Sequence, residues 1–348
     1  MMPTLGRRRA LVAAVAAAML SLTACGSDSA DTSSGSSSGD TGSAFPVSLN
    51  NTFGTAEIEE KPEKVATVNW GNHDVPIALG IVPVGIAKAN YGDDDKDGML
   101  PWTTEALEGL GADKMPTLFD ETDAIDFEAV ANTEPNVILA AYSGLTDKDY
   151  TTLSEIAPTV SFPQVAWGTN WKDMALINGE ALGMKEEAEE KVAEVEDTIE
   201  KSLAERPDVT GKSVAYVWYD VTDPSKLWVY SPLDARVQLL GDLGMKNSTG
   251  VEKLFEASKE FGLEISSEKV DQIADADIVA LYGDDKTLST MQKDPLVGKV
   301  PAIKRGSVVV LPDNTPQAAA TSGPTVLSIP WVVEDYLDLF QGAATKIG

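Results

Sequence analysis

The stretch "KVATVNWGNHDVPIALGIVPVGIA" (64–87) sets the fold class of this chain. Its pattern predicts a strand over 64–69, a helix over 73–80 that ends in a glycine, and a second strand over 83–87. Strands separated by helices form parallel sheets, because a parallel pair needs a crossover connection. The stretch therefore predicts an α/β unit.

A long helical pattern over 170–206 divides the chain. It has a possible kink at Gly183 and no proline before Pro207. A straight helix of this length would reach roughly 50 Å, which is longer than one small domain is wide. We therefore expect it to join two lobes. Its apolar stripe consists of Ala188, Val192, Val195, Ile199 and Leu203.

Strand and helix patterns alternate on both sides of this segment. Before it we expect helices at 125–135 and at 146–157, the latter capped by Thr146, and strands at 136–142 and 159–162. After it we expect strands at 213–219, 226–231, 277–283 and 307–312 and helices at 233–243, 266–274 and 330–343. The sequence thus predicts an α/β fold of two lobes with mostly parallel central sheets, an N-terminal lobe at 46–169 and a C-terminal lobe at 207–348, joined by one long interlobe helix.

The N-terminal region has the features of a secreted, membrane-anchored protein. Three arginines at 7–9 precede an apolar run at 10–22, which is shorter than the roughly 20 residues of a bilayer span and typical of a secretory signal. The run ends in Leu-Thr-Ala-Cys25, which resembles the lipobox of bacterial lipoproteins, and Cys25 is the only cysteine. Acylation of that residue, with palmitate-type chains, would hold the protein at the outer face of the cell membrane. The predicted segments are a signal peptide at 1–24 and a lipidated Cys25 with a flexible Ser/Gly tether at 25–45.

The composition excludes several classes of function. The chain has 27 Lys and Arg against 55 Asp and Glu, a formal charge of −28, and such a field makes nucleic acid and anionic bilayers poor partners. His73 is the only histidine, so neither a Cys–His catalytic pair nor a histidine-rich metal site is available. We therefore expect no enzyme, no resident metal and no cofactor.

Aromatic residues concentrate near the carboxyl ends of the predicted strands, where α/β sheets bind ligands. Each ring alone could instead cap a core, but their recurrence in both lobes indicates a large ligand held by ring contacts. The candidate ligand-binding aromatics are Trp70, Tyr91, Trp102, Tyr142, Trp167, Trp218, Tyr219, Tyr230 and Tyr282.

Several stretches, in this order and spacing, resemble the solute-binding lipoproteins of ABC importers for ferric siderophores, a family that includes cobalamin and haem receptors. They are "KPEKVATVN", "HDVPIALGIVPVGI", "IDFEAVANTEPNVILAAYSG", "LSEIAPTV", the long helix from Trp171, "ISSEKVDQIADADIVAL" and "IPWVVEDYLDLF". The resemblance implies a periplasmic-binding-protein-like fold with a helical hinge. It also implies a monomer that binds an iron–siderophore complex between its lobes and delivers it to an ABC permease and its ATPase.

The resemblance implies an arginine in the pocket as well, because guanidinium meets hydroxamate or catecholate oxygens. Arg236 is the candidate, and an arginine on a helix surface is the alternative reading. Some relatives place a first-lobe arginine around the position where this chain has Asp120, Glu121 and Asp123. This difference favours a neutral or cationic hydroxamate or mixed-ligand complex over a triply anionic catecholate.

Members of this family dock on their permease through one surface carboxylate on each lobe. The resemblance assigns these roles to Asp74, early in the first helix, and to Glu252 in "TGVEKLFE". Asp74 could instead be an acid favoured by the dipole at the helix start.

Other ligands and a different class of function stay open at this level. Haem could bind through a tyrosine or His73 as axial ligand, and cobalamin is carried by the same architecture. An extracytoplasmic enzyme would need paired groups with shifted pKa values in the cleft, and the acids are too numerous for the sequence to single out a pair.

The acidic stretch "YGDDDKDGML" (91–100) partly matches a calcium loop. Asp93, Asp95, Asp97 and Gly98 occupy positions 1, 3, 5 and 6, but the twelfth position is Thr104 where a glutamate is required. We expect a solvated acidic loop near the cleft and leave cation binding open.

Overall fold

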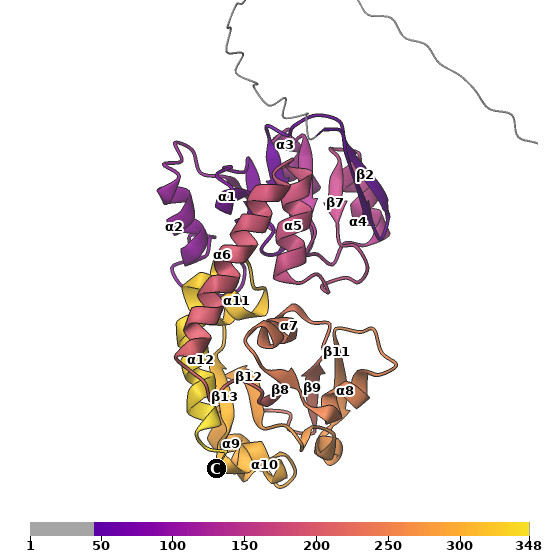
Figure 1. Cartoon of the computed structure of the whole chain (residues 1–348). Helices are drawn as coiled ribbons and strands as arrows, with labels where there is room; N and C mark the ends of the chain where they lie inside the picture. The colour runs from indigo at the N-terminus through magenta and orange to yellow at the C-terminus, as the bar shows by residue number, and fades with distance from the viewer. Residues whose placement is uncertain (1–44, 348) are drawn as a thin grey trace, which may run out of the picture. The chain divides into compact units, whose positions relative to one another are not determined.

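The computed structural model describes residues 45–347, which fold into two lobes (Figure 1). The predicted signal peptide, Cys25 and nearly all of the predicted tether lie outside the described residues. Within 45–347, no helix combines the length and the hydrophobicity that a membrane span requires.

The first lobe is built on a fully parallel sheet in the order β5-β4-β3-β6-β7. Its central strand β3 and the neighbouring strand β6 are entirely buried, because helices cover both faces of a parallel sheet. An antiparallel hairpin, β1 and β2, precedes the sheet. The strands are β1 (Val47–Asn51), β2 (Gly54–Ile58), β3 (Val65–Thr67), β4 (Gly85–Ala87), β5 (Thr117–Phe119), β6 (Val137–Ala140) and β7 (Thr159–Ser161).

Short helices connect these strands. The predicted cap at Thr146 is confirmed: its side chain accepts a hydrogen bond from the backbone of Asp149, whose carboxylate bonds back to Thr146. The helices are α1 (Asp74–Ala78), α2 (Pro101–Gly109), α3 (Phe127–Asn132), α4 (Asp147–Ser154) and α5 (Trp171–Ala181).

The second lobe has a mixed sheet in the order β11-β9-β8-β12-β13, with β10 also paired to β8. Strands β8, β12 and β13 are parallel, whereas β9 and β11 run antiparallel to their neighbours. The connection at 219–225 is too short for a crossover, so β8 and β9 form a hairpin instead of a parallel pair. The strands are β8 (Ser213–Trp218), β9 (Lys226–Tyr230), β10 (Lys246–Asn247), β11 (Gly262–Ser266), β12 (Ile278–Gly283) and β13 (Val308–Pro312).

The helices of the second lobe include the predicted ones, and the predicted helix at 266–274 is a 3₁₀ segment. They are α7 (Ala235–Asp242), α8 (Thr249–Phe255), η1 (Ser267–Ile273), α9 (Thr287–Lys293), η2 (Val297–Lys299), α10 (Pro301–Arg305), α11 (Pro316–Ser322) and α12 (Ser328–Ala344).

The structure divides the predicted helical segment over 170–206 into α5 and α6 (Lys185–Ala204), at the possible kink that the sequence indicates at Gly183. Gly183 between them has φ +65°, a left-handed conformation that ends α5. The two helices pack closely: a Cβ on Gly179 would lie 2.4 Å from the Cβ of Ala188. Only α6 continues to the second lobe, so the connecting helix spans roughly 30 Å rather than 50 Å.

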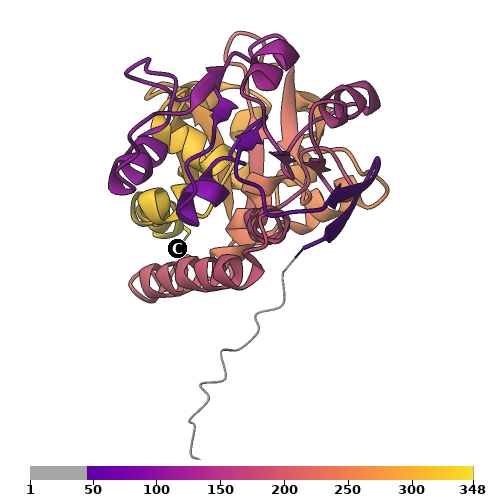
Figure 2. The same cartoon turned by 90° about the horizontal axis from the view of Figure 1, so that it is seen from above.

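Helix α6 lies beside α12, and the two run in the same direction (Figures 1 and 2). The predicted apolar stripe on α6 is buried at Ala188, Val192, Val195 and Ile199. At its end Arg206 pairs with Glu334 and Asp338 of α12, each at 2.6 Å. The connection between the lobes is therefore a packed pair of helices.

Candidate functional site

The first lobe places polar and aromatic residues just after its parallel strands. Asn69 and Trp70 follow β3, Tyr91 follows β4, Glu121 follows β5, Tyr142 follows β6 and Trp167 lies in the loop after β7. Because the strands are parallel, these residues share one edge of the sheet.

Three aromatic rings at this edge form a row of contacts that leads from Tyr91 through Trp70 to Trp167. The Trp70 and Tyr91 rings are stacked, with centroids 6.3 Å apart and planes at 8°. Trp167 lies 6.2 Å from Trp70 and meets Tyr142 edge-on at 5.3 Å. Gly144 makes room for this indole, because a Cβ there would lie 2.4 Å from Trp167 Nε1. Trp70 keeps 39% of its surface exposed, so the first lobe presents an accessible aromatic surface.

In the second lobe, the charged side chain of Arg236 packs against tyrosine rings. The Arg236 guanidinium lies 4.0 Å from the Tyr230 ring centroid and 5.7 Å from that of Tyr282. Tyr216 meets both rings, at 5.7 Å and 5.6 Å. Cation–π contact with electron-rich rings stabilises an arginine that is largely removed from water.

Asp234 holds Arg236 in this position. Arg236 Nε donates to Asp234 Oδ1 at 2.7 Å, and the Asp234 side chain also caps α7 by accepting from the Arg236 backbone N–H. Burial raises the pKa of the Asp234 carboxyl, and the attraction of Arg236 opposes that shift. The hydrogen bond uses only Nε, so most of the five N–H donors of the guanidinium are not taken by this carboxylate.

Contacts between the lobes complete the site. Burial raises the pKa of Tyr142 in the first lobe, and this residue also interacts electrostatically with Asp234 and Arg236 of the second lobe. The Tyr91 hydroxyl donates to Asp313 Oδ1 at 2.7 Å, and the Gly92 backbone N–H donates to Asn314 Oδ1 at 2.8 Å. The structure thus gathers seven of the predicted binding residues between the lobes: Trp70, Tyr91, Tyr142, Trp167, Tyr230, Arg236 and Tyr282.

Three other predicted binding residues, Trp102, Trp218 and Tyr219, are not part of this group of rings. Tyr219 is buried in the separate core beneath the second sheet, because side chains alternate between the faces of a strand and its neighbours. Trp102 is buried against Trp331, and its indole N–H donates to Asp74. Tyr219 therefore lies away from the rings of the site, whereas Trp102 lines a first-lobe cavity together with Trp70 and Tyr91, and a binding role for either stays a prediction. Trp218 is 44% exposed at the end of β8 and contacts none of the described rings of the site.

The sequence prediction missed an aromatic pair beside the site. Trp228 of β9 stands on the same face as Tyr230 and contacts Phe261 at 5.7 Å. Gly262 makes space for it, because a Cβ there would lie 2.1 Å from Trp228 Nε1. The period-two pattern of "KLWVY" pairs Trp228 with Tyr230 and could have identified it.

A cavity of about 220 Å³ opens at the first-lobe edge of the site. Glu121 lines it, and its Oε2 accepts hydrogen bonds from the backbone and side-chain nitrogens of Asn69, both at 2.9 Å. The sequence prediction had noted Glu121 only as an acid in place of an arginine. The lining residues are Asn69, Trp70, Ala87, Lys88, Asn90, Glu121 and Trp167.

The docking assignment of Asp74 is wrong, because this carboxylate is 1% exposed. It accepts hydrogen bonds from Trp102 Nε1 at 2.8 Å, Thr103 Oγ1 at 2.9 Å and Thr325 Oγ1 at 2.5 Å. Thr325 precedes α12, so Asp74 ties the first lobe to the segment that returns from the second. Glu252 lies exposed in the first turn of α8, and its docking role stays a prediction.

His73 lies beside Asp74, with Nε2 3.5 Å from Asp74 Oδ1. Burial lowers the pKa of His73, although Asp74 opposes the shift, so the ring is neutral near pH 7. His73 also lines a cavity together with Trp70 and Tyr91, and its role as an axial ligand stays an open alternative.

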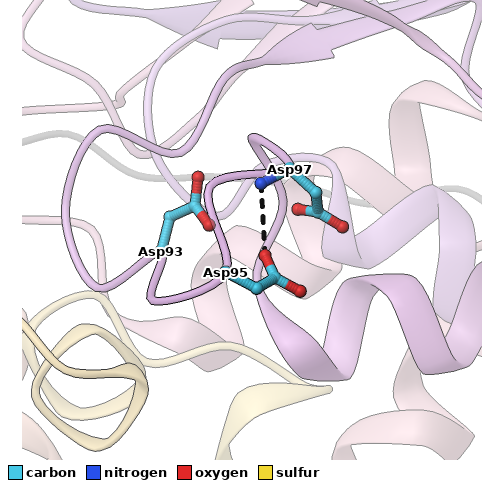
Figure 3. Close-up of side chains that lie close together, drawn as sticks. All are labelled: Asp93, Asp95 and Asp97. Carbon is cyan, nitrogen blue, oxygen red and sulfur yellow. Dashed lines mark hydrogen bonds between the residues drawn. The ribbon is translucent and has the colours of Figure 1, made fainter.

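The acidic loop brings the carboxylates of Asp93, Asp95 and Asp97 together, with candidate ligand oxygens within 4.8 Å of one another (Figure 3). These oxygens accept hydrogen bonds from backbone N–H groups of the same loop, including those of Lys96, Asp97, Gly98 and Met99. Within 45–347 this is the one group of three or more His, Cys, Asp or Glu residues close enough to hold a metal ion. Its hydrogen bonds account for its shape as a turn, in agreement with the expected solvated loop.

Comparison with known proteins reveals several relatives over most of this chain. PiaA of Streptococcus pneumoniae TIGR4, solved in complex with ferrichrome, is 46% identical, with a TM-score of 0.83 over 86% of this chain and 99% of that chain. The "Probable siderophore-binding lipoprotein YfiY" of Bacillus subtilis (strain 168) is 25% identical over 266 residues, 76% of this chain and 75% of that protein. Staphylococcus aureus SirA, complexed with staphyloferrin B, is 21% identical and shares the fold, with a TM-score of 0.64 over 84% of this chain and 98% of that chain.

The sequence model of the family described as "Periplasmic binding protein" matches residues 65–315. This range begins at β3 and includes both lobes, α6 and the rings between the lobes. The chain therefore belongs to the periplasmic binding protein family.

Proposed function

We propose that this protein captures a ferric siderophore between its lobes and delivers it, chemically unchanged, to an ABC permease. The observation that carries the proposal is the Arg236 guanidinium, held against Tyr230 and Tyr282 and close enough to Tyr142 of the first lobe to interact with it electrostatically. In a chain of formal charge −28, a nearly buried cation in a ring-lined site indicates a ligand with anionic or strongly polar oxygens and apolar surfaces.

The hydroxamate class fits this chemistry. Ferric trihydroxamates carry their oxygens around the iron and apolar carbon chains outside, so guanidinium donors and aromatic faces can be satisfied together. PiaA, 46% identical to this chain, was solved with ferrichrome, a ligand of this class, which supports the proposal. The ligand is cargo, and no resident cofactor is proposed.

The test is a titration of the purified mature protein with ferrichrome, followed by tryptophan fluorescence. Saturable quenching by ferrichrome and little response to iron-free ligand, ferric citrate or bare ferric ion is the expected result. Equal quenching by bare metal ions, absence of binding to any ferric hydroxamate, or purification with a haem Soret band or a cobalamin spectrum would each overturn the proposal. A named relative binds ferric dicitrate, which makes ferric citrate an informative competitor.

We also propose that Cys25 is lipidated and anchors the mature protein outside the cytoplasm. The Leu-Thr-Ala-Cys25 sequence and the name of the lipoprotein YfiY support this location. The variant Cys25→Ala should leave the membrane fraction or stay unprocessed. Unchanged acylation of that variant would exclude the assignment.

Glu252 is the carboxylate proposed to dock on the permease from the second lobe. It is exposed at the start of α8, where it is free to pair with an arginine of the partner. Glu252→Gln should reduce ferric-siderophore uptake while ferrichrome affinity stays unchanged. Glu256→Gln, which removes the same charge four residues along, serves as the control, and normal uptake by both variants would remove Glu252 from this role.

A further inference from the structure

Glu121 has one carboxylate oxygen in use and one without a partner. Oε2 accepts both hydrogen bonds from Asn69, which has φ +58° and directs its backbone N–H toward this oxygen. Oε1 is buried and accepts no hydrogen bond from any residue in 45–347. An unpaired buried acceptor is costly, so such groups in a binding site point to a donor supplied from outside.

The surroundings of Glu121 identify where that donor would come from. Glu121 lines the cavity of about 220 Å³ together with Trp70 and Trp167, the two indoles of the site. Lys88 also lines this cavity, but it is exposed, and it does not supply a hydrogen bond to Oε1 of Glu121. Glu121 therefore lines the space beside the two indoles, and its free oxygen has no cation of the described chain as partner.

The negative charge of Glu121 would favour some ligands over others. A carboxylate that is shielded from water interacts strongly with nearby charge, because the local dielectric is low. Burial raises the pKa of Glu121, and the two hydrogen bonds from Asn69 oppose this shift. A polyanionic ligand bound against Trp70 would be repelled by this carboxylate. A ligand with an N–H group could instead donate a hydrogen bond to Oε1.

We propose that Glu121 is a specificity-determining residue that accepts a hydrogen bond from an N–H of a neutral or cationic ferric hydroxamate and rejects polyanionic ferric complexes. This inference rests on the proposed function and assigns the selection to one side chain. The second lobe attracts ligand oxygens through Arg236, and the first lobe then discriminates by charge through Glu121.

The decisive variant is Glu121→Gln, because glutamine keeps one oxygen for Asn69 and replaces the free acceptor with an uncharged N–H donor. Two probes are used: ferrichrome, which is neutral and has peptide N–H groups, and a ferric tris-catecholate complex, which carries three negative charges. We expect ferrichrome affinity to fall about tenfold and tris-catecholate affinity to rise, since hydrogen bonds to charged groups contribute roughly that factor or more.

The matched control is Asp123→Asn, which removes the same formal charge two residues away at an exposed position. Its ratio of affinities for the two probes should change less than twofold. Glu121→Ala, which also loses the anchor for Asn69, should lower the melting temperature, whereas Glu121→Gln should leave it within a degree or two.

The inference is overturned if Glu121→Gln binds ferrichrome as tightly as the unmodified protein, or if Asp123→Asn changes the affinity ratio equally. Failure of the unmodified protein to bind any ferric hydroxamate would instead reject the proposed function. A loss of ferrichrome affinity matched by an equal loss for the tris-catecholate would assign Glu121 to positioning of Trp70 alone and also overturn the inference.

Discussion

Each lobe buries a charged group near the junction, but the two groups have different partners. In the first lobe, Asp74 accepts three hydrogen bonds from side chains of the protein. In the second lobe, Arg236 gives only Nε to a carboxylate and rests on tyrosine rings. A charge that the chain satisfies completely stabilises the fold, whereas one left with unused donors can bind a ligand. Burial alone therefore does not identify a site; the partners do.

Removal of the second-lobe charge should have the largest effect. Arg236→Met should weaken ferrichrome binding by about 2–5 kcal/mol, because a desolvated charge loses its hydrogen bonds to the ligand. Isothermal titration calorimetry measures the change.

The paired variant Arg236→Met with Asp234→Asn separates binding from folding, because it leaves no unpaired carboxylate. It should recover stability but not affinity. Full ferrichrome affinity in either variant would show that Arg236, like Asp74, has a structural role only.

Loss of the first-lobe charge should act on stability instead. Asp74→Asn should lower the free energy of unfolding by about 1–3 kcal/mol, since the amide cannot accept from Trp102, Thr103 and Thr325 together. Urea unfolding is the measurement, and Asp94→Asn, at an exposed position, should change stability little. An unchanged unfolding midpoint for Asp74→Asn would contradict its structural role.

The tryptophans Trp70 and Trp102 allow a second test of the difference between binding groups and structural groups. Trp70→Leu should reduce ferrichrome affinity by about 0.5–1.5 kcal/mol with little change in melting temperature, because this indole is 39% exposed. Trp102→Phe removes the N–H that bonds Asp74 and should lower the melting temperature while affinity is kept. If instead Trp70→Leu lowered the melting temperature and Trp102→Phe lowered the affinity, Trp102 rather than Trp70 would be the residue that binds the ligand.

The smallest expected effect is a dependence of stability on pH through His73. Its pKa is lowered in the folded protein from the usual 6.5, so the unfolded chain binds more protons below about pH 6.5. Stability should therefore fall as the pH drops from 7 through 6.5 toward the folded-state pKa. His73→Gln should flatten that part of the curve, measured as unfolding free energy at pH 7.0, 6.0 and 5.5. Parallel curves for the two proteins would show that His73 does not contribute.

Much of the fold could be predicted because local patterns suffice for it. The buried strand β6, the capped helix α4 and the apolar stripe of α6 each depend on residues close in sequence. The break at Gly183 was only indicated, since a glycine in a helical pattern is compatible with both a helix and its end. The antiparallel strands β9 and β11 depend on strand pairing across the lobe, which periodicity does not encode.

The candidate site divides in the same way. Sequence alone determined that Trp70, Tyr142, Trp167, Tyr230 and Tyr282 stand near strand ends and that Arg236 is one of few arginines, because strand position and composition are local properties. The burial of Asp74, the orientation of Tyr219 toward the other core and the free oxygen of Glu121 became visible only in the folded chain. The physical reason is that these three facts depend on which donors and surfaces distant segments bring to one point, and Thr325, which satisfies Asp74, is 251 residues away in the chain.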